Sequence, residues 1–206
     1  MSNQSFFATQ IYYESLAPDR GELNKINRQL LLEAEEIAAL DTSGQCWSKK
    51  NYRNGFTSYG SANELHKRST TFERLEHQIQ KHVNTYARSL GWDLGGGKLQ
   101  MTTCWVNIMG QNAHHSLHLH PLSVVSGTYY VSTPSNTPAI KFEDPRLSKM
   151  MASPPVKESA RQNQRFVSLP AKAGKLVLFE SWLRHEVPMN PAKTPRVSIS
   201  FNYEWV

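Results

Sequence analysis

Cysteine and long apolar segments are both scarce in this sequence. Only Cys46 and Cys104 occur among the 206 residues. Two cysteines so far apart do not make a disulfide framework, so a reducing compartment is expected. No apolar run approaches the ~20 residues that a membrane-spanning helix needs. The N-terminal segment lacks a basic stretch followed by an apolar one, so we expect no secretory signal peptide. These absences predict a cytoplasmic protein with no membrane partner.

Positive charge is in excess but is not concentrated. The formal net charge is +6 and the pI is about 9.3. The closest groupings are Lys49 and Lys50 with Arg53, and Lys67 with Arg68. A basic balance permits an acidic partner such as nucleic acid, but scattered lysines are typical of an ordinary solvated surface. The charge therefore supports a nucleic-acid partner only weakly.

Helical periodicity dominates the first half of the chain. Asp19 with Glu22 and Thr70 with Glu73 resemble the capping boxes that begin helices. Gly91 is a natural stop for the second helix. Each predicted helix carries apolar residues at three- and four-residue steps, which places them on one face. These residues are Leu23, Ile26, Leu30, Ala34 and Ile37 in the first helix, and Phe72, Leu75, Ile79, Val83, Tyr86 and Leu90 in the second.

The stretch between these helices, residues 43–69, is polar and contains Gly44, Gly55 and Gly60. We predict a loop there, with one short strand at most. The run of glycines at 95–97 marks a turn. It lacks the strand–GxGxxG–helix context of a dinucleotide site, which excludes phosphate binding at this position.

After residue 97 the segments become short and rich in β-branched and aromatic residues, with Pro, Asn and Ser between them. This pattern predicts eight strands. They are expected at 99–109, 115–120, 124–133, 138–143, 165–169, 175–180, 184–188 and 195–204. Eight strands after two helices indicate an antiparallel sandwich or barrel of the jelly-roll kind, with the helices packed on one sheet.

The length of the chain suits a single domain, residues 1–206. Residues 1–97 would form a largely helical support, and residues 98–206 the jelly-roll core. The polar segment 146–164 contains Pro154-Pro155 and connects two predicted strands. Long loops at the mouth of a barrel often act as lids, so this segment is a candidate lid.

Half of the eight histidines lie within seven consecutive positions, at 114, 115, 118 and 120. His118 and His120 are two residues apart. On an extended strand, that spacing places both imidazoles on the same face. Two imidazoles so close together can bind one metal ion, with iron and zinc as the candidates.

A third ligand would have to come from a neighbouring strand. His185 is the best candidate, because it follows an apolar strand from Gly174 to Phe179 and a turn. Three protein ligands leave three positions of an octahedral iron open for substrate and O2. The sequence therefore predicts a metal site of His118, His120 and His185.

Arg196 begins a segment that alternates polar and apolar residues. Ser198, Ser200 and Asn202 share its face, whereas the apolar residues take the other face. An inward arginine in a barrel is costly unless it meets an anion. A dicarboxylate would supply that anion, since a guanidinium group grips a carboxylate through two hydrogen bonds. From this strand alone, the solvated side of an edge strand is an open alternative.

Taken in order, these pieces resemble the Fe(II)/2-oxoglutarate oxygenase superfamily. They are most similar to a family of 2-oxoglutarate/Fe(II) oxygenases known mainly from bacteria and phages, which would place the protein in a bacterial cell. The matching pieces span about half the chain. They are Trp105–Asn107, His115–Pro121, Ser126–Val131, Phe142–Arg146, Gly174–Phe179, Ser181–His185 and Arg196–Asn202.

The resemblance implies a double-stranded β-helix fold with Fe(II) as the metal and 2-oxoglutarate and O2 as co-substrates. It implies that Arg196, helped by Ser198, anchors 2-oxoglutarate. Tyr130 resembles the tyrosine that some superfamily members use to hold this co-substrate. The reaction would be oxidative decarboxylation of 2-oxoglutarate to succinate, coupled to hydroxylation of a prime substrate that the sequence does not identify.

Strand alternation adds candidates for the wall of the pocket. If Tyr130 faces the iron, Thr128 and Ser126 do so as well. Asn107 could line the pocket. His115 is expected behind the metal ligands or at the surface, since a bend in its strand would change the face that it takes.

One position departs from the superfamily pattern, which is His-x-Asp/Glu followed by a distant histidine. This chain has His120 where that carboxylate stands. A third neutral ligand leaves the iron more positive. Glu143 or Asp144 could supply a carboxylate instead, although a turn with Pro145 also accounts for both.

Two other functions stay open at this point. One is a three-histidine, cupin-like dioxygenase that binds its substrate directly to the metal and needs no keto acid. The other is a jelly-roll binding module in which the metal only stabilises the fold. Arg196 favours an oxygenase that uses 2-oxoglutarate over both alternatives, because neither alternative needs that arginine to anchor a co-substrate.

Overall fold

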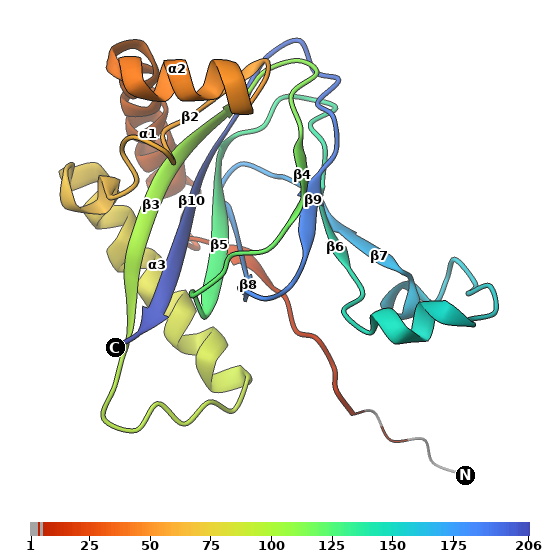
Figure 1. Cartoon of the computed structure of the whole chain (residues 1–206). Helices are drawn as coiled ribbons and strands as arrows, with labels where there is room; N and C mark the ends of the chain where they lie inside the picture. The colour runs from red at the N-terminus through yellow and green to blue at the C-terminus, as the bar shows by residue number, and fades with distance from the viewer. Residues whose placement is uncertain (1–3, 5) are drawn as a thin grey trace.

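A computed structural model describes residue 4 and residues 6–206. Two antiparallel sheets face each other within this part of the chain, and helices cover one of them (Figure 1). The helices are α1 (Arg20–Leu40), α2 (Thr42–Asn51) and α3 (Thr70–Ser89). The strands are β1 (Tyr12–Ser15), β2 (Gly55–Thr57), β3 (Leu99–Met109), β4 (His115–His118), β5 (Val125–Ser132), β6 (Ile140–Glu143), β7 (Phe166–Leu169), β8 (Lys175–Glu180), β9 (His185–Val187) and β10 (Arg196–Trp205).

The larger sheet has the strand order β1-β8-β5-β10-β3-β2, and the smaller one the order β4-β9-β6-β7. All pairings between the strands are antiparallel. β5 and β10 occupy the middle of the larger sheet and are buried along almost their whole length, because both faces of this sheet are covered. The jelly-roll class predicted from the sequence is confirmed.

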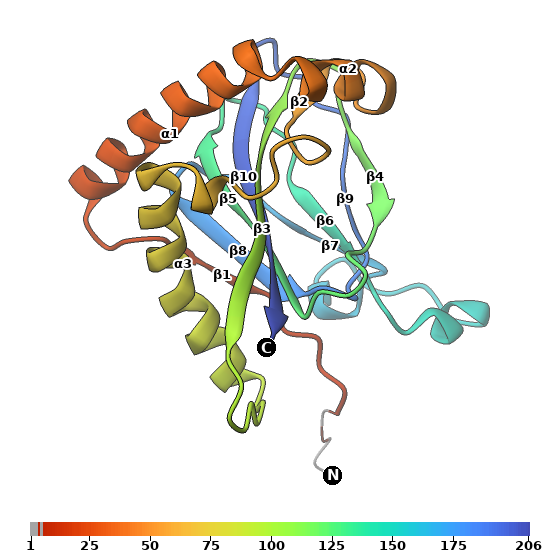
Figure 2. The ribbon, with the colours of Figure 1, turned by 60° about the vertical axis from the view of Figure 1, so that its left-hand side comes forward.

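The outer face of the larger sheet packs against α1 and α3 (Figure 2). Both helices bury the stripe of apolar residues that their sequences predict, including Leu30 of α1 and Leu75 and Ile79 of α3. Ile199 and Phe201 of β10 point into the same core. Burying a leucine or isoleucine side chain in this way stabilises the fold by about 1.5–3 kcal/mol. The helices and the larger sheet therefore share one core.

A second apolar cluster lies between the two sheets and closes one side of the jelly roll. It contains Tyr130 and Phe179 from the larger sheet and Phe142 and Val187 from the smaller one. The rings of Phe142 and Phe179 meet edge to face at 5.1 Å. This cluster fixes the spacing between the sheets and so determines the width of the space beside it.

The structure corrects the prediction for residues 43–69. We expected a loop there, but residues 42–51 form α2, which lies across one end of the sandwich (Figure 1). Asp41 begins this helix by accepting a hydrogen bond from the backbone of Gly44. The apolar pattern of α2 is weak, since its buried residues are Gly44 and Ser48. Periodicity of apolar side chains could not reveal a helix that packs through its small residues.

Three smaller predictions are also corrected. The cap of α3 is Ser69 rather than Thr70, because the Ser69 hydroxyl accepts from the first helical amides. β1 adds a strand that was not expected in the largely helical region, whereas β2 is the one short strand allowed for residues 43–69. The strand expected at 115–120 ends at His118. The other seven predicted strands are present with small shifts of their ends.

Residues 144–164 form an arm that leaves the small sheet between β6 and β7 and extends away from the sandwich (Figure 1). It contains two 3-10 turns, at Leu147–Met151 and Arg161–Asn163. Among the described residues, no helix is both long and apolar enough to cross a membrane.

Candidate metal centre and co-substrate pocket

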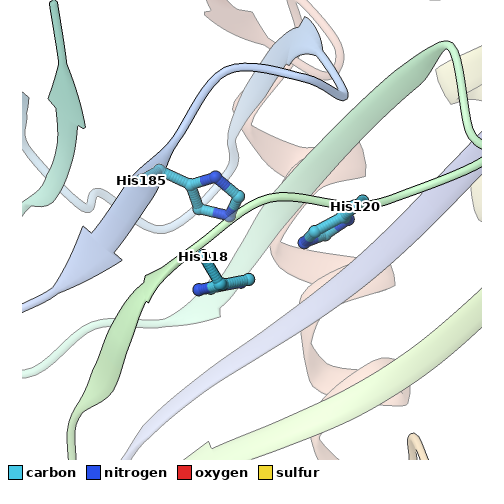
Figure 3. A group of neighbouring side chains, drawn as sticks. All are labelled: His118, His120 and His185. Atoms are coloured by element: carbon cyan, nitrogen blue, oxygen red, sulfur yellow. The ribbon is translucent and has the colours of Figure 1, made fainter. Parts of the chain in front are cut away.

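The structure brings together the three histidines that the sequence singles out. His118 ends β4 and is paired in register with His185, the first residue of β9. His120 follows two residues after His118, where its backbone amide donates to the carbonyl of Ser181. The ring centroids lie 4.3 Å apart for His118 and His185, 5.1 Å for His120 and His185, and 5.3 Å for His118 and His120. Figure 3 shows one segment supplying two of the rings and the neighbouring strand the third.

Each of these imidazoles has one nitrogen satisfied and one free. The Nδ1 atom of His118 lies 2.6 Å from the Ser116 carbonyl, and that of His185 lies 3.0 Å from the Leu183 carbonyl. An oxygen acceptor requires the ring nitrogen to carry the proton, so Nε2 holds the lone pair. One ligand nitrogen from each of the three histidines lies within 4.8 Å of the other two. A donor set of this kind, with its second nitrogens already bonded to the protein, fits a metal ion.

His120 is held by a larger network. Its Nδ1 donates to Oδ1 of Asn202 at 2.6 Å, and the Ser126 hydroxyl lies 3.0 Å from the same nitrogen. Ser126 also donates to Oδ1 of Asn202 at 2.8 Å and contacts the Ser181 hydroxyl at 2.8 Å. Ser126 therefore lies behind His120 rather than in the wall of the pocket. The network connects β5, β10 and the β8–β9 turn to one ring.

The protonation of these rings favours metal binding. Burial lowers the pKa of His185 to about 3, and the neighbouring His118 adds to the effect. Burial also lowers the pKa of His120, although its hydrogen bond to Asn202 opposes the shift. A neutral imidazole is the form that binds a metal.

A cavity of about 520 Å³ lies between the two sheets beside the three histidines. This volume is within the range of small-molecule sites. Its wall contains several residues predicted for the pocket: Asn107, His115, Thr128, Arg196 and Ser198. Tyr130 is fully buried behind the wall, where its ring lies 5.3 Å from the guanidinium group of Arg196.

His115 also lies in this wall. Its ring stacks on Tyr52 at 4.4 Å between centroids. Burial lowers the pKa of His115 to about 3, and the nearby charge of Arg196 adds to this effect. A shift of register between His115 and His118 explains why residues three positions apart reach the same side. Strict alternation would have placed them on opposite faces.

Arg196 is a buried cation without a matching anion. Its side chain is 3% exposed, although it lines the cavity. Nη1 donates to the carbonyl of Pro138 at 3.2 Å, whereas Nε has no partner among the described residues. No described carboxylate forms an ion pair with it. β10 is central in its sheet, so the alternative of a solvated edge strand is wrong. The group fits a bound dicarboxylate.

Two phenol groups near Arg196 are also unsatisfied. The hydroxyls of Tyr52 and Tyr130 have no hydrogen-bond partner among the described residues. Burial raises the pKa of Tyr130 to about 12 and also raises that of Tyr52, while the charge of Arg196 opposes both shifts. Both phenols therefore remain donors at neutral pH. A carboxylate placed at Arg196 would offer them an acceptor.

The two acidic residues considered as alternative ligands lie elsewhere. Glu143 is buried and forms ion pairs with Arg184 at 3.0 Å and Arg165 at 3.4 Å. Asp144 pairs with Arg146 at 2.8 Å. Neither residue lines the cavity or joins the histidine group. They tie β6 to the start of β9 and to the base of the arm.

Sequence reasoning missed the outer rim of the cavity, which α2 and the residues after it provide. Its members are Trp47, Lys50, Asn51, Tyr52, Arg53 and Tyr59. They belong to the segment expected to be a loop, and only the small grouping of Lys50 with Arg53 gave any signal. The arm at 146–164 contributes no residue to the cavity wall, so the structure does not place this candidate lid over the pocket.

Residues 103–202 match the sequence profile of a family described as "Putative 2OG-Fe(II) oxygenase". This region, just under half of the chain, resembles that family. The matched region begins within β3 and ends within β10, and it contains the three histidines and Arg196. No curated protein matches the sequence.

Solved structures of such oxygenases resemble the fold over almost the whole chain. The epimerase SnoN from nogalamycin biosynthesis gives a TM-score of 0.63 at 14% identity, over 96% of this chain and 77% of its own. HygX from Streptomyces hygroscopicus, with nickel, 2-oxoglutarate and hygromycin B bound, gives 0.62 at 13%, over 96% and 83%. A Pseudomonas putida prolyl-4-hydroxylase gives 0.58 at 14%, over 95% and 92%. These likenesses establish the double-stranded β-helix fold.

Proposed function

We propose that the protein is an Fe(II)- and 2-oxoglutarate-dependent oxygenase whose metal is held by Nε2 of His118, His120 and His185. Three observations support this ligand set. The three rings converge, each Nδ1 is bonded to a protein oxygen, and burial keeps His120 and His185 neutral. A facial set of three protein ligands leaves coordination positions open, which an oxygenase needs.

The observation that carries the co-substrate assignment is the unmatched charge of Arg196. A buried guanidinium group without an anion is costly, and a carboxylate in the cavity would remove that cost. Ser198 lies on the same face of β10 and lines the cavity, and Tyr130 has a free hydroxyl beside the guanidinium. We assign these three residues to the distal carboxylate of 2-oxoglutarate.

The family's reaction consumes one 2-oxoglutarate and one O2, and yields succinate, CO2 and a substrate in which one C–H bond has become C–OH. Bound iron supplies the oxidising chemistry. The residues of this chain orient and enclose the reactants. Asn202 and Ser126 fix the ring of His120, and Arg196 orients the keto acid. Phe179, packed against His185 at 4.5 Å between centroids, excludes water from the apolar side of the site.

Purified protein incubated with Fe(II), 2-oxoglutarate and O2 should release succinate, slowly if no prime substrate is present. His185→Ala should abolish this release and weaken Fe(II) binding, measured by competition with a coloured chelator. His77→Ala is the matched control, because His77 is exposed on α3. Equal succinate release by the wild type and His185→Ala would refute the assignment.

The all-histidine ligand set also favours one second candidate. A three-histidine dioxygenase that binds its substrate directly to the metal would need no keto acid. The two functions differ in one measurement, since only the first binds 2-oxoglutarate and forms succinate from it.

Cys46 and Cys104 are both free thiols, which supports the reducing cytoplasm as the proposed location.

A further inference from the structure

The rim of the cavity carries positive charge and no negative charge. Among the described residues that line it, none is Asp or Glu, whereas Lys50 and Arg53 stand at the rim and Arg196 lies inside. Neither Lys50 nor Arg53 forms an ion pair with any described carboxylate. The proposed keto acid neutralises the charge of Arg196. It does not neutralise Lys50 and Arg53, so these two cations attract a second anion to the mouth of the cavity.

Helix electrostatics account for only part of this charge. Lys49 and Lys50 both lie in the last turn of α2, where cations complement the helix dipole. Of the two, only Lys50 lines the cavity. Arg53 lies one residue beyond the C-cap residue Tyr52. Stabilisation of the helix favours cations at its C-terminal end but does not require that Lys50 and Arg53 line the cavity.

A line of aromatic rings leads from this rim to the metal ligands. The indole of Trp47 packs over the turn at Gly60, since a Cβ atom there would lie 3.0 Å from it. The adjacent Tyr59 meets Trp105 at 5.0 Å between centroids, and Trp105 lies 6.1 Å from His120. Trp47 and Tyr59 are 37% and 48% exposed, so part of each ring is open to solvent at the cavity. Exposed aromatic faces of this kind suit the stacking of a flat ring.

We propose that the prime substrate is a nucleoside phosphate, whose ring stacks on the exposed aromatic surface of Trp47 and Tyr59 and whose phosphate binds Lys50 and Arg53. This inference rests on the proposed function, since it assigns the substrate of the same site. Trp105 contacts both the stacking surface and His120, so the stacked nucleoside is delivered beside the metal. One of its C–H bonds is converted to C–OH, with 2-oxoglutarate and O2 as the co-reactants already named.

The test is calorimetric binding to the anaerobic protein loaded with Fe(II) and 2-oxoglutarate. The probes are the four deoxynucleoside 5'-monophosphates, the matching nucleosides, inorganic phosphate and a short single-stranded oligonucleotide. At least one monophosphate should bind about tenfold or more tightly than its nucleoside, and added salt should weaken that binding. If the oligonucleotide binds more tightly than the monophosphates, the substrate is a nucleotide within a polymer. If a monophosphate binds more tightly than the oligonucleotide, the substrate is the free nucleotide.

Variants separate charge from stacking. Lys50→Glu and Arg53→Glu should each weaken binding of the monophosphate about tenfold. Lys49→Glu, on the same helix but outside the cavity, should change that binding less than about twofold. Trp47→Ala should weaken binding about 5- to 100-fold through lost stacking. Trp205→Ala is its control, since Trp205 is exposed and is the last residue of β10, whose C-terminal end lies far from α2 (Figure 1). Lys50→Gln and thermal unfolding of every variant guard against loss of folding.

Several results would overturn the proposal. One is a wild-type protein that binds 2-oxoglutarate and releases succinate but binds no nucleotide probe. Others are equal affinity for nucleoside and monophosphate, equal effects of Lys49→Glu and Lys50→Glu on monophosphate binding, or inorganic phosphate that binds as tightly as every monophosphate. Failure of the proposed function would look different, because the wild type would then release no succinate whatever it binds at the rim.

Discussion

Replacing Arg196 with methionine should abolish tight binding of 2-oxoglutarate without harming the fold. Methionine keeps an unbranched chain in the same buried space but removes the charge and all five N–H donors. The 3% exposure of Arg196 means that the surrounding protein, rather than water, would have to compensate for a lost contact. Besides the interaction with the keto acid, the substitution removes the hydrogen bond to the Pro138 carbonyl and the contact with the Tyr130 ring.

The size of the effect follows from the geometry. A guanidinium group that grips a carboxylate forms two charge-assisted hydrogen bonds, each worth about 1.5–3 kcal/mol. Losing both costs about 3–6 kcal/mol, which weakens binding roughly 10²- to 10⁴-fold. Without the keto acid, the free energy of unfolding should change little, because removing a buried cation that has no ion-pair partner offsets the loss of its hydrogen bond to Pro138.

The assay is an anaerobic calorimetric titration of the metal-loaded protein with 2-oxoglutarate. Arg196→Lys should bind with intermediate affinity, because it keeps the charge and loses the fork. Arg88→Met, on the exposed side of α3, is the control and should bind as the wild type does. In thermal unfolding, 2-oxoglutarate at 100 times its Kd should stabilise the wild type by about 2.7 kcal/mol and leave Arg196→Met unchanged.

Two results would refute this reasoning. If Arg196→Met binds 2-oxoglutarate as tightly as the wild type, the arginine does not anchor the keto acid. If the variant unfolds several kcal/mol more easily without any ligand, the charge of Arg196 stabilises the fold by more than its hydrogen bond to Pro138, and the reasoning that it awaits a bound anion fails.

Three other changes test the surroundings of the site. Asn202→Leu should weaken metal binding about 10- to 100-fold, because it removes the acceptor that orients His120; an unchanged metal Kd would contradict this role. Glu143→Gln should cost only about 1 kcal/mol of unfolding free energy, since Arg184 is 43% exposed, and should leave metal affinity unchanged; lost metal binding would make Glu143 a ligand. Burial lowers the pKa of His66, so the unfolded chain takes up the proton first as pH falls. The wild type should therefore lose up to about 1.4 kcal/mol per pH unit below about pH 6.5 from this residue. His66→Leu should lose correspondingly less over the same range, as denaturant titrations at several pH values can show.

The sequence predicts the metal-ligand candidates because their geometry is local. A spacing of two residues keeps His118 and His120 on one side even though the strand ends between them. His185 follows from its place after an apolar strand, and the alternation in β10 places Arg196 inward. These features depend only on the period of an extended chain. The longer strands and the two amphipathic helices were predicted for the same reason.

The rim of the cavity could not be predicted, because it depends on packing between distant segments. α2 has no apolar stripe, and it is stable through its Asp41 cap and the close approach of Gly44 and Ser48 to their neighbours. The pairing of β1 with β8 joins segments more than 150 residues apart. The register shift that brings His115 into the wall also leaves no trace in the sequence. Tertiary contacts decide each of these features.

Among the described residues, none that lines the cavity is acidic, and this has a thermodynamic consequence. A divalent cation that enters the site meets three neutral imidazoles and the fixed charge of Arg196, with no protein carboxylate to offset either charge. The dianionic keto acid then supplies charge that neutralises both cations. We therefore expect metal and 2-oxoglutarate to bind cooperatively, each raising the affinity of the other by the same factor, as linkage requires. Metal titrations with and without 2-oxoglutarate would measure that factor. Without 2-oxoglutarate, this three-histidine site should release its metal more readily than a site in which a protein carboxylate is the third ligand.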